Sequence, residues 1–177
     1  MIAVHVVVDG YNLIRQSASL RGEEEVSLEH GREALIDELR QYKLIKRHRL
    51  TVVFDGADKV TLAEEKTQRK GIKIIYSSQG RTADSVIRRI CRDQGENVLV
   101  VTSDGELRSY AESYGSVVMA SEEFEAKLEM LFYANLKGVE SEDEGEGWNP
   151  AMGTSKRGPA RKLSKKERRR RQRLRKL

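Results

Sequence analysis

The sequence predicts an α/β domain with a mainly parallel sheet, followed by a basic C-terminal tail that is disordered in isolation. Two observations support this fold class. Short, continuous runs of β-branched residues are typical of parallel strands that are covered on both faces. These runs alternate with segments in which apolar residues recur at the helical period, as expected for βαβ units. The length of 177 residues suits one such domain and a tail.

Five runs have the composition of buried strands, and helices are expected between them. The expected strands are residues 4–8, 50–54, 72–76, 98–101 and 117–119. The first helix is expected from Ser27, a favoured N-cap residue, to about residue 46, because apolar residues follow at helical spacing. Residues 15–25 are polar and are expected to form a mobile loop. Residues 57–71 are expected to be irregular, with one helical turn.

Three further helices are expected after the later strands. Thr82 is the expected cap of the first of them, whose apolar residues follow the 3.6-residue period. Ser103 and Glu106 have the spacing of a capping box before the second. Ser121 is expected to begin the last helix.

The composition excludes several classes of protein. No segment approaches the roughly 20 apolar residues of a membrane helix, and the N-terminus lacks the basic region and cleavage site of a secretory signal. A single cysteine, Cys91, excludes an internal disulfide and a cysteine-based zinc site. Of the three histidines, His5 is expected in the core, whereas His30 and His48 are expected to be exposed. We therefore expect a cytoplasmic protein.

The charge is divided unevenly along the chain. The domain is expected over residues 1–137, an acidic and glycine-rich linker over 138–155, and an Arg/Lys-rich tail over 156–177. The tail carries 13 basic residues and one acidic residue, whereas the other 155 residues carry 20 basic and 27 acidic ones. Such a tail implies a polyanionic partner rather than a membrane. A basic helix could follow Ser164, but the tail has too few apolar residues to bury a face by itself.

Four aspartates follow the ends of expected strands. Asp9 follows the first strand, Asp55 the second and Asp104 the fourth. Asp84 lies in the first turn of the helix after the third strand. Because the carboxyl ends of parallel strands share one edge of a sheet, we expect these carboxylates to converge, with Asn12 nearby.

Converging carboxylates repel one another, and a divalent cation relieves that repulsion. Oxygen ligands without histidine or cysteine suit Mg²⁺ or Mn²⁺. Such a cation can bind a phosphate oxygen and lower the pKa of a bound water, which together support hydrolysis of a phosphodiester. The pattern therefore predicts a metal-dependent phosphodiesterase site.

Each aspartate also has a structural explanation. Asp-Gly after a strand is commonly a turn, which accounts for Asp9 or Asp55 taken singly. Asp104 could serve only the dipole of its helix, and Asp84 could pair with Arg88 four residues on. The presence of four such residues on one expected edge favours the common site.

The residues around these aspartates resemble a known family. Val-Val-Val-Asp-Gly-Tyr-Asn-Leu-Ile at residues 6–14 is similar to the opening signature of NYN domains, which are PIN-like nucleases. The resemblance continues in Phe-Asp-Gly at 54–56, Thr-Ala-Asp-Ser-Val-Ile at 82–87 and Val-Thr-Ser-Asp-Gly-Glu-Leu at 101–107. It spans about residues 1–135, is closest to the YacP-like branch, and says nothing of the basic tail.

This resemblance implies a PIN-like three-layer α/β/α sandwich with a metal-dependent endoribonuclease site. Asp9 and Asp84 would be the central metal ligands, and Asp104 would complete the cluster directly or through water. Asn12 would orient a ligand or a phosphate, and Asp55 is a possible additional acidic position.

Two further residues are candidates for contact with substrate. Arg81 precedes the helix of Asp84 and could touch a phosphate, or could be a solvated loop charge. Ser103 places a hydroxyl beside the expected cluster.

The function predicted is hydrolysis of single-stranded RNA by a divalent-metal-dependent endoribonuclease, in mRNA turnover or translation-linked RNA processing. The ribosome is a further candidate partner, and the oligomeric state stays open. The alternative is a noncatalytic RNA- or ribosome-binding module. A haloacid-dehalogenase-like phosphatase would need a second aspartate where Tyr11 stands, and a P-loop is absent.

Overall fold

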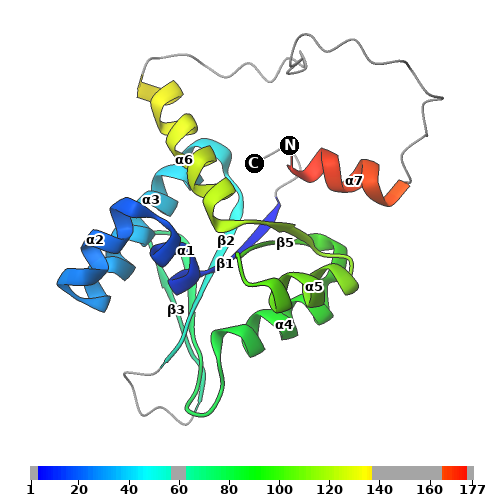
Figure 1. Cartoon of the computed structure of the whole chain (residues 1–177), viewed down its shortest axis with the longest axis horizontal. Coiled ribbons are helices and arrows are strands. Elements are labelled where there is room, and N and C mark those ends of the chain that lie inside the picture. The colour runs from blue at the N-terminus through cyan, green and yellow to red at the C-terminus, as the bar shows by residue number, and fades with distance from the viewer. Residues whose placement is uncertain (1–3, 57–62, 137–164, 175–177) are drawn as a thin grey trace.

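The computed structural model describes residues 4–56, 63–136 and 165–174, and it has the α/β architecture that the sequence predicts (Figure 1). Its sheet has six strands in the order β3-β4-β2-β1-β5-β6. Neighbouring strands are parallel except for β3, which pairs antiparallel with β4 at the sheet edge. The strands are β1 (His5–Asp9), β2 (Arg49–Phe54), β3 (Glu65–Arg69), β4 (Ile72–Tyr76), β5 (Val98–Val101) and β6 (Val117–Met119).

Helices cover both faces of this sheet and give a three-layer α/β/α sandwich (Figure 1). Helices α1, α2, α3 and α6 pack on one face, and α4 and α5 pack on the other. The helices of the sandwich are α1 (Gly10–Gln16), α2 (Ala18–Val26), α3 (Leu28–Lys46), α4 (Ala83–Gln94), α5 (Gly105–Ser113) and α6 (Ser121–Leu136). The crossovers place the carboxyl ends of the parallel strands at one edge.

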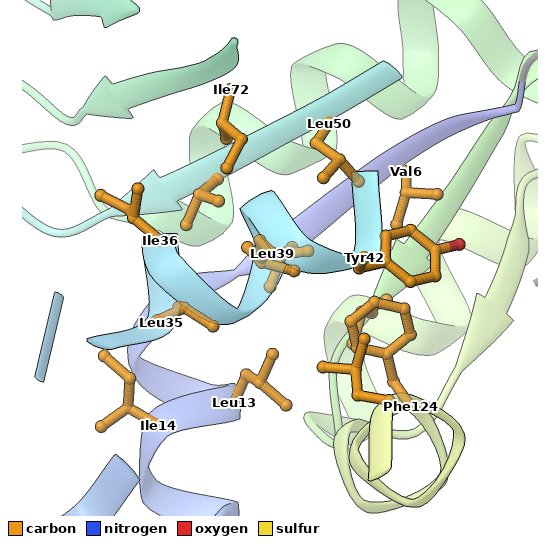
Figure 2. Packing of buried hydrophobic residues seen from close by; sticks show 14 of the residues in the cluster. Val6, Leu13, Ile14, Leu35, Ile36, Leu39, Tyr42, Leu50, Ile72 and Phe124 are labelled. Carbon is orange, nitrogen blue, oxygen red and sulfur yellow. The ribbon is translucent and has the colours of Figure 1, made fainter. Parts of the chain in front are cut away.

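The core lies in two layers because successive strand residues point to opposite faces. The larger layer packs the sheet against α3, with Leu39 and Tyr42 at its centre and Phe124 of α6 against them (Figure 2). The Tyr42 and Phe124 rings meet edge to face, with centroids 5.6 Å apart. The smaller layer packs α4 and α5 against alternate strand residues such as Val7 and Val53. These strands are buried on both faces, as their continuous apolar runs predict.

Two expectations from local pattern are wrong. Residues 15–25 are helical rather than a loop, because Ser17 caps α2 with its hydroxyl and the short, polar α2 packs along α3. Leu20 is the one residue of α2 that is fully buried, so the apolar period that identifies a helix is missing. The segment predicted as irregular contains β3, a polar edge strand that is formed by pairing with β4.

The structure also corrects two side-chain assignments. Asp104, rather than Ser103, is the N-cap of α5. His48 is buried rather than exposed, because α3 ends at Arg47 in the left-handed conformation and the chain turns inward. The Nδ1 atom of His48 accepts a hydrogen bond from the Val4 N–H, with a length of 3.3 Å. His5 is buried as predicted.

The described part of the basic tail forms a helix, α7 (Lys165–Leu174), in the segment after Ser164 where the sequence allows a basic helix. Leu174, one of the few apolar residues of the tail, is half-buried and packs against the larger core layer, and α7 contacts β6. A tail that cannot bury a face by itself therefore gains an apolar contact from the domain. The predicted linker, 138–155, lies outside the described residues.

No helix within the described ranges has both the length and the apolar content needed to span a bilayer.

Candidate functional site

Asp9 stands at the carboxyl end of β1, in the middle of the sheet between β2 and β5. It is the N-cap of α1, and its Oδ1 atom accepts a hydrogen bond from the Asn12 N–H at 3.4 Å. Its Oδ2 atom accepts one from the Thr102 hydroxyl at 3.2 Å. Burial, with smaller contributions from the charges of Asp55 and Asp84, raises the pKa of Asp9 to about 6 against the effect of these hydrogen bonds. Asp9 is thus a half-buried carboxyl group that faces other carboxylates.

Asp55 and Asp84 approach Asp9 from the next strand and from α4. Asp55 follows β2, and its Oδ1 atom accepts a hydrogen bond of 2.6 Å from the N–H of Ala83, the first residue of α4. Asp84 is the second residue of α4, and its Oδ2 atom accepts one of 2.8 Å from Arg88 Nε. Both predicted positions therefore lie at the edge where Asp9 lies.

Asp104 joins this group through a shared hydroxyl. Its Oδ1 atom accepts a hydrogen bond of 2.7 Å from the Leu107 N–H and so caps α5. Its own N–H donates to the Thr102 hydroxyl at 3.2 Å, and the same hydroxyl donates to Asp9. Thr102 is completely buried and connects the two aspartates that end β1 and follow β5.

Asn12 joins three segments of the chain beneath the acidic edge. Its Oδ1 atom accepts hydrogen bonds from the Ser103 N–H at 2.8 Å and from the Ser121 hydroxyl at 2.7 Å. The Ser103 hydroxyl accepts from the Ser121 N–H and donates to Glu122. That last hydrogen bond lowers the pKa of Glu122. Asn12 and Ser103 therefore position the loop that carries Asp104.

Sequence reasoning missed Ser121 and Glu122 as neighbours of the site. A signal for them was present, because both follow the fifth expected strand and so belong to the same edge of the sheet. Glu122 is exposed and adds a fifth carboxylate beside Ser103.

Arg81 and Arg88 are the cations near α4. Arg81 is exposed. The hydrogen bond from Arg89 is the main cause that lowers the pKa of Glu64, and the charge of Arg81 makes a smaller contribution in the same direction. Asp84 and Arg88 form an ion pair, as the structural explanation of Asp84 predicts. Arg88 also lies over the Tyr110 ring, with its guanidinium carbon 4.8 Å from the ring centroid.

A row of aromatic rings with two arginines borders the acidic edge. Tyr11 follows Asp9 by two residues, and its ring centroid is 5.2 Å from that of Phe54. The Phe54 ring stacks on Tyr76, which ends β4, at 5.7 Å. The Arg32 guanidinium lies 5.8 Å and 5.7 Å from the centroids of the two tyrosine rings, and Arg15 lies 5.6 Å from the Tyr11 ring. Cations held on aromatic faces therefore stand next to the carboxylates.

The donor set fits a divalent cation in its chemistry. In the conformation described, no three acidic, histidine or cysteine side chains among the described residues are close enough to hold a metal ion together. Each aspartate uses an oxygen for a structural hydrogen bond, yet Asp55 Oδ2, Asp84 Oδ1 and Asp104 Oδ2 accept none from a described residue. A carboxylate has several lone pairs, so each can keep its structural partner and offer the second oxygen. Burial and the facing carboxylates raise the pKa of Asp9, and a bound cation would oppose both effects.

Comparison with known proteins agrees with the fold. The chain is 30% identical over 102 residues to the uncharacterised protein YacP of Bacillus subtilis (strain 168), which is 56% of this chain and 59% of that relative's length. It is similar to the crystal structure of a mutant of Rae1 (YacP) from Bacillus subtilis, with a TM-score of 0.64 and 22% identity over 81% of this chain and 85% of that one. A second crystal structure of Rae1 (YacP) gives a TM-score of 0.61 over 78% and 80% of the two chains, also at 22% identity.

The family model of the YacP-like NYN domain matches residues 6–176. This match extends well beyond residue 135, where the resemblance in the sequence ends, and it includes the segment of α7. The chain therefore belongs to the YacP-like NYN domain family.

Proposed function

We propose that this protein is a divalent-metal-dependent endoribonuclease that hydrolyses phosphodiester bonds of single-stranded RNA. NYN domains are a PIN-like nuclease family, which indicates a nuclease-type function with RNA as substrate. PIN-like NYN nucleases generally use divalent metals. The observation that carries the proposal is the placement of Asp9, Asp55, Asp84 and Asp104, which end or follow parallel strands or begin α4 and so share one edge of the sheet.

In this proposal the carboxylates hold Mg²⁺ or Mn²⁺. Asp9 and Asp84 are the central ligands, Asp104 completes the set, and Asp55 is an additional acidic group. The cation supplies charge for a phosphate oxygen and lowers the pKa of a bound water. Asn12 keeps the loop of Asp104 in place through its hydrogen bonds to Ser103 and Ser121.

Cations outside the acidic cluster attract the RNA backbone. Arg32 and Arg15 border the edge on the faces of Tyr11 and Tyr76, where they can contact phosphates on either side of the cleaved bond. Arg81 remains a candidate for the same role from the loop before α4. The basic tail offsets the repulsion between RNA and an acidic domain.

The test is cleavage of end-labelled single-stranded RNA in Mg²⁺ or Mn²⁺, alone and in the presence of translating ribosomes. Asp84→Asn is compared with Asp93→Asn, which makes the same change at the other end of α4 and also removes one exposed ion pair. We expect the first variant to lose at least about 100-fold in cleavage rate, as for loss of a group that stabilises a transition-state charge. The second variant should cut as the wild type does, and a chelator should abolish cleavage.

The alternative function is an RNA- or ribosome-binding module without catalysis. It predicts RNA binding that survives Asp84→Asn and no metal-dependent cutting with either presentation of the RNA. Cleavage that Asp84→Asn leaves unchanged would contradict the proposed site.

A further inference from the structure

A second recess lies at the opposite edge of the sheet, at the amino ends of β1, β2 and β4. Its volume is about 570 Å³, which is within the range of small-molecule sites in proteins. His5 and Arg49 begin β1 and β2, and Gln94 ends α4, so the recess is separated from the aspartates by the length of the strands. None of the acidic residues of the candidate nuclease site lines it.

The strand register explains why this recess is polar. His5 is paired with Arg49, and Thr51 with Lys73, so all four side chains point to the face that α4 covers. Further along the same face Val53 and its neighbours form the smaller core layer. Gln94, the last residue of α4, reaches the amino-terminal part of this face and contacts His5 and Arg49 there through its side-chain oxygen. Polar and basic side chains therefore replace apolar ones there.

The charge of the recess is strongly positive. Lys43, Arg49, Lys66 and Lys73 line it, and no aspartate or glutamate is among the lining residues. Lys66 lies 3.8 Å from Glu64, which is itself held by two hydrogen bonds from Arg89. Lys73 forms no ion pair with any residue in the described ranges. Arg49, Lys66 and Lys73 point to one face of the sheet, and Lys43 reaches the recess from α3, where it donates to the Gly71 carbonyl oxygen. Cations gathered in this way repel one another, and a bound anion relieves that repulsion.

A hydrogen-bond network holds the arginine of this recess in place. Arg49 Nη2 donates to Gln94 Oε1 at 2.9 Å and lies 2.6 Å from His5 Nδ1. His5 Nε2 is 2.9 Å from the Thr51 hydroxyl, which is buried. Burial lowers the pKa of His5, the hydrogen bond with Gln94 opposes this effect, and the charges of Arg49 and Lys73 lower the pKa further. Arg49 Nη1 and Nε donate to no described residue, and a fixed guanidinium with free N–H groups suits a phosphate.

We propose that this recess binds a phosphate ester of nucleotide size at a site distinct from the carboxylate edge. Several cations suit a group with more than one negative charge, and the volume admits a base and a sugar beside the phosphate. A free nucleotide and the phosphates of an RNA strand share this chemistry. The proposal does not depend on RNA cleavage.

The test uses the three histidines of the chain as reporters. In the full-length protein with isotope-labelled histidine, the ring signals are followed by NMR during titration with adenosine monophosphate, in a chelator so that no cleavage occurs. We expect a saturable shift of the His5 signal, whereas His30 on the exposed start of α3 and the buried His48 stay unchanged. Adenosine, which lacks the phosphate, should produce no such shift.

Two variants assign the binding to the recess. Lys73→Gln removes an exposed charge without breaking the Arg49 network and should weaken binding about tenfold, as for a charge-assisted contact. Lys127→Gln makes the same change on α6, which packs on the other face of the sheet, and should have no effect. An unchanged His48 signal shows that each variant is folded.

A second titration with a short RNA that lacks terminal phosphates distinguishes the two sources. A His5 shift with the mononucleotide would identify the ligand as a free nucleotide. A shift with the RNA but not with the mononucleotide would identify it as the backbone of an RNA strand. Either result supports the proposal. No saturable shift of His5 with either probe would overturn it, as would an affinity that Lys73→Gln leaves unchanged. Because binding is read without catalysis, loss of the nuclease proposal would leave this result intact.

Discussion

The aspartates of the acidic edge have a structural and a functional role at the same time. Asp9, Asp55 and Asp104 each accept a hydrogen bond from a backbone N–H at the start of a helix. Each of these aspartates therefore has a structural role at a helix start, and this role does not compete with the common site. A cap needs one oxygen, and the helix start that it serves is also what directs the carboxylate to the edge.

The three glycines after these aspartates differ in their surroundings and provide a prediction. A Cβ at Gly56 would lie 2.0 Å from the Ser77 carbonyl oxygen, and one at Gly10 would lie 2.3 Å from Cε1 of the buried Phe54 ring. A Cβ at Gly105 meets nothing within 4 Å. We expect Gly56→Ala and Gly10→Ala each to lower the free energy of unfolding by roughly 1–3 kcal/mol. Gly105→Ala, at the start of α5, should be neutral or slightly stabilising.

Urea denaturation of the three alanine variants measures these differences. Equal effects at all three positions would mean that the glycines are needed for turn conformation rather than for close packing.

Among the helices and strands, those that bury an apolar face along their length could be predicted from the sequence. The five buried strands, α3, α4 and α6 have apolar residues at the period of their structure, and all are confirmed. The short helix α2 and the edge strand β3 were not predicted because neither buries an apolar face. Gly31 allows α3 to approach the α2 backbone, since a Cβ at this position would lie 3.1 Å from the Glu24 Cα, and β3 depends on β4. Such elements are defined by a partner that local patterns do not contain.

The packing of α3 on α6 predicts a dependence of stability on pH. Burial raises the pKa of Glu38 from its ordinary value of 4.5 to about 7, and the charges of Glu125 and Glu129 add to this. The folded state then binds a proton more tightly than the unfolded state, so stability should fall as the pH rises from about 4.5 to about 7. Glu38→Gln should remove this loss and stabilise the protein above pH 7 by on the order of 1 kcal/mol, allowing for solvent screening.

Thermal or urea unfolding between pH 4.5 and 8 measures the effect. The raised pKa of Asp9 acts in the same direction, so the difference between wild type and Glu38→Gln isolates Glu38. Parallel curves for the two proteins would contradict the assignment.

At the scale of the whole molecule, charge is separated between an acidic domain and a basic end. The tail carries 13 of the 33 basic residues, and the rest of the chain has more acidic than basic groups. The described helix α7 contacts the domain through Leu174 and β6. The sequence predicts the charge of the tail, but its contact with the sheet depends on one leucine and could not be predicted from composition.

This separation predicts how RNA binding responds to salt. Arg171 and Arg173 lie in the last turn of α7. The double variant Arg171→Gln/Arg173→Gln should reduce the slope of log affinity against log salt concentration. The expected reduction is about 0.7 for each phosphate that α7 no longer neutralises. Removal of the same charge from the domain, with Arg21→Gln and Arg40→Gln, should leave the slope close to that of the wild type. Fluorescence anisotropy with labelled RNA at several salt concentrations measures both slopes. An equal reduction by the two double variants would mean that net charge, and not contact by α7, determines the affinity.

The placement of the aspartates at one edge of the sheet could be predicted from the sequence. Strand ends and the rule that parallel strands share an edge were enough to bring Asp9, Asp55 and Asp84 together, as their mutual effect on the pKa of Asp9 requires. The Thr102 link to Asp104 and the place of Glu122 depend on side-chain conformation. Strand order and loop geometry are needed to find such contacts, and neither can be read from local spacing.

The proposed function requires a divalent cation at the acidic edge. Paramagnetic broadening by Mn²⁺ measures this directly, because it detects weak binding without RNA. Small additions of Mn²⁺ to the full-length protein should first broaden the backbone amide signals around Asp9, Asp84 and Asp104. Asp9→Asn should largely remove this selective broadening, while Asp93→Asn should leave it unchanged. Broadening that begins on the exposed glutamates of α2, or that Asp9→Asn does not alter, would contradict the account.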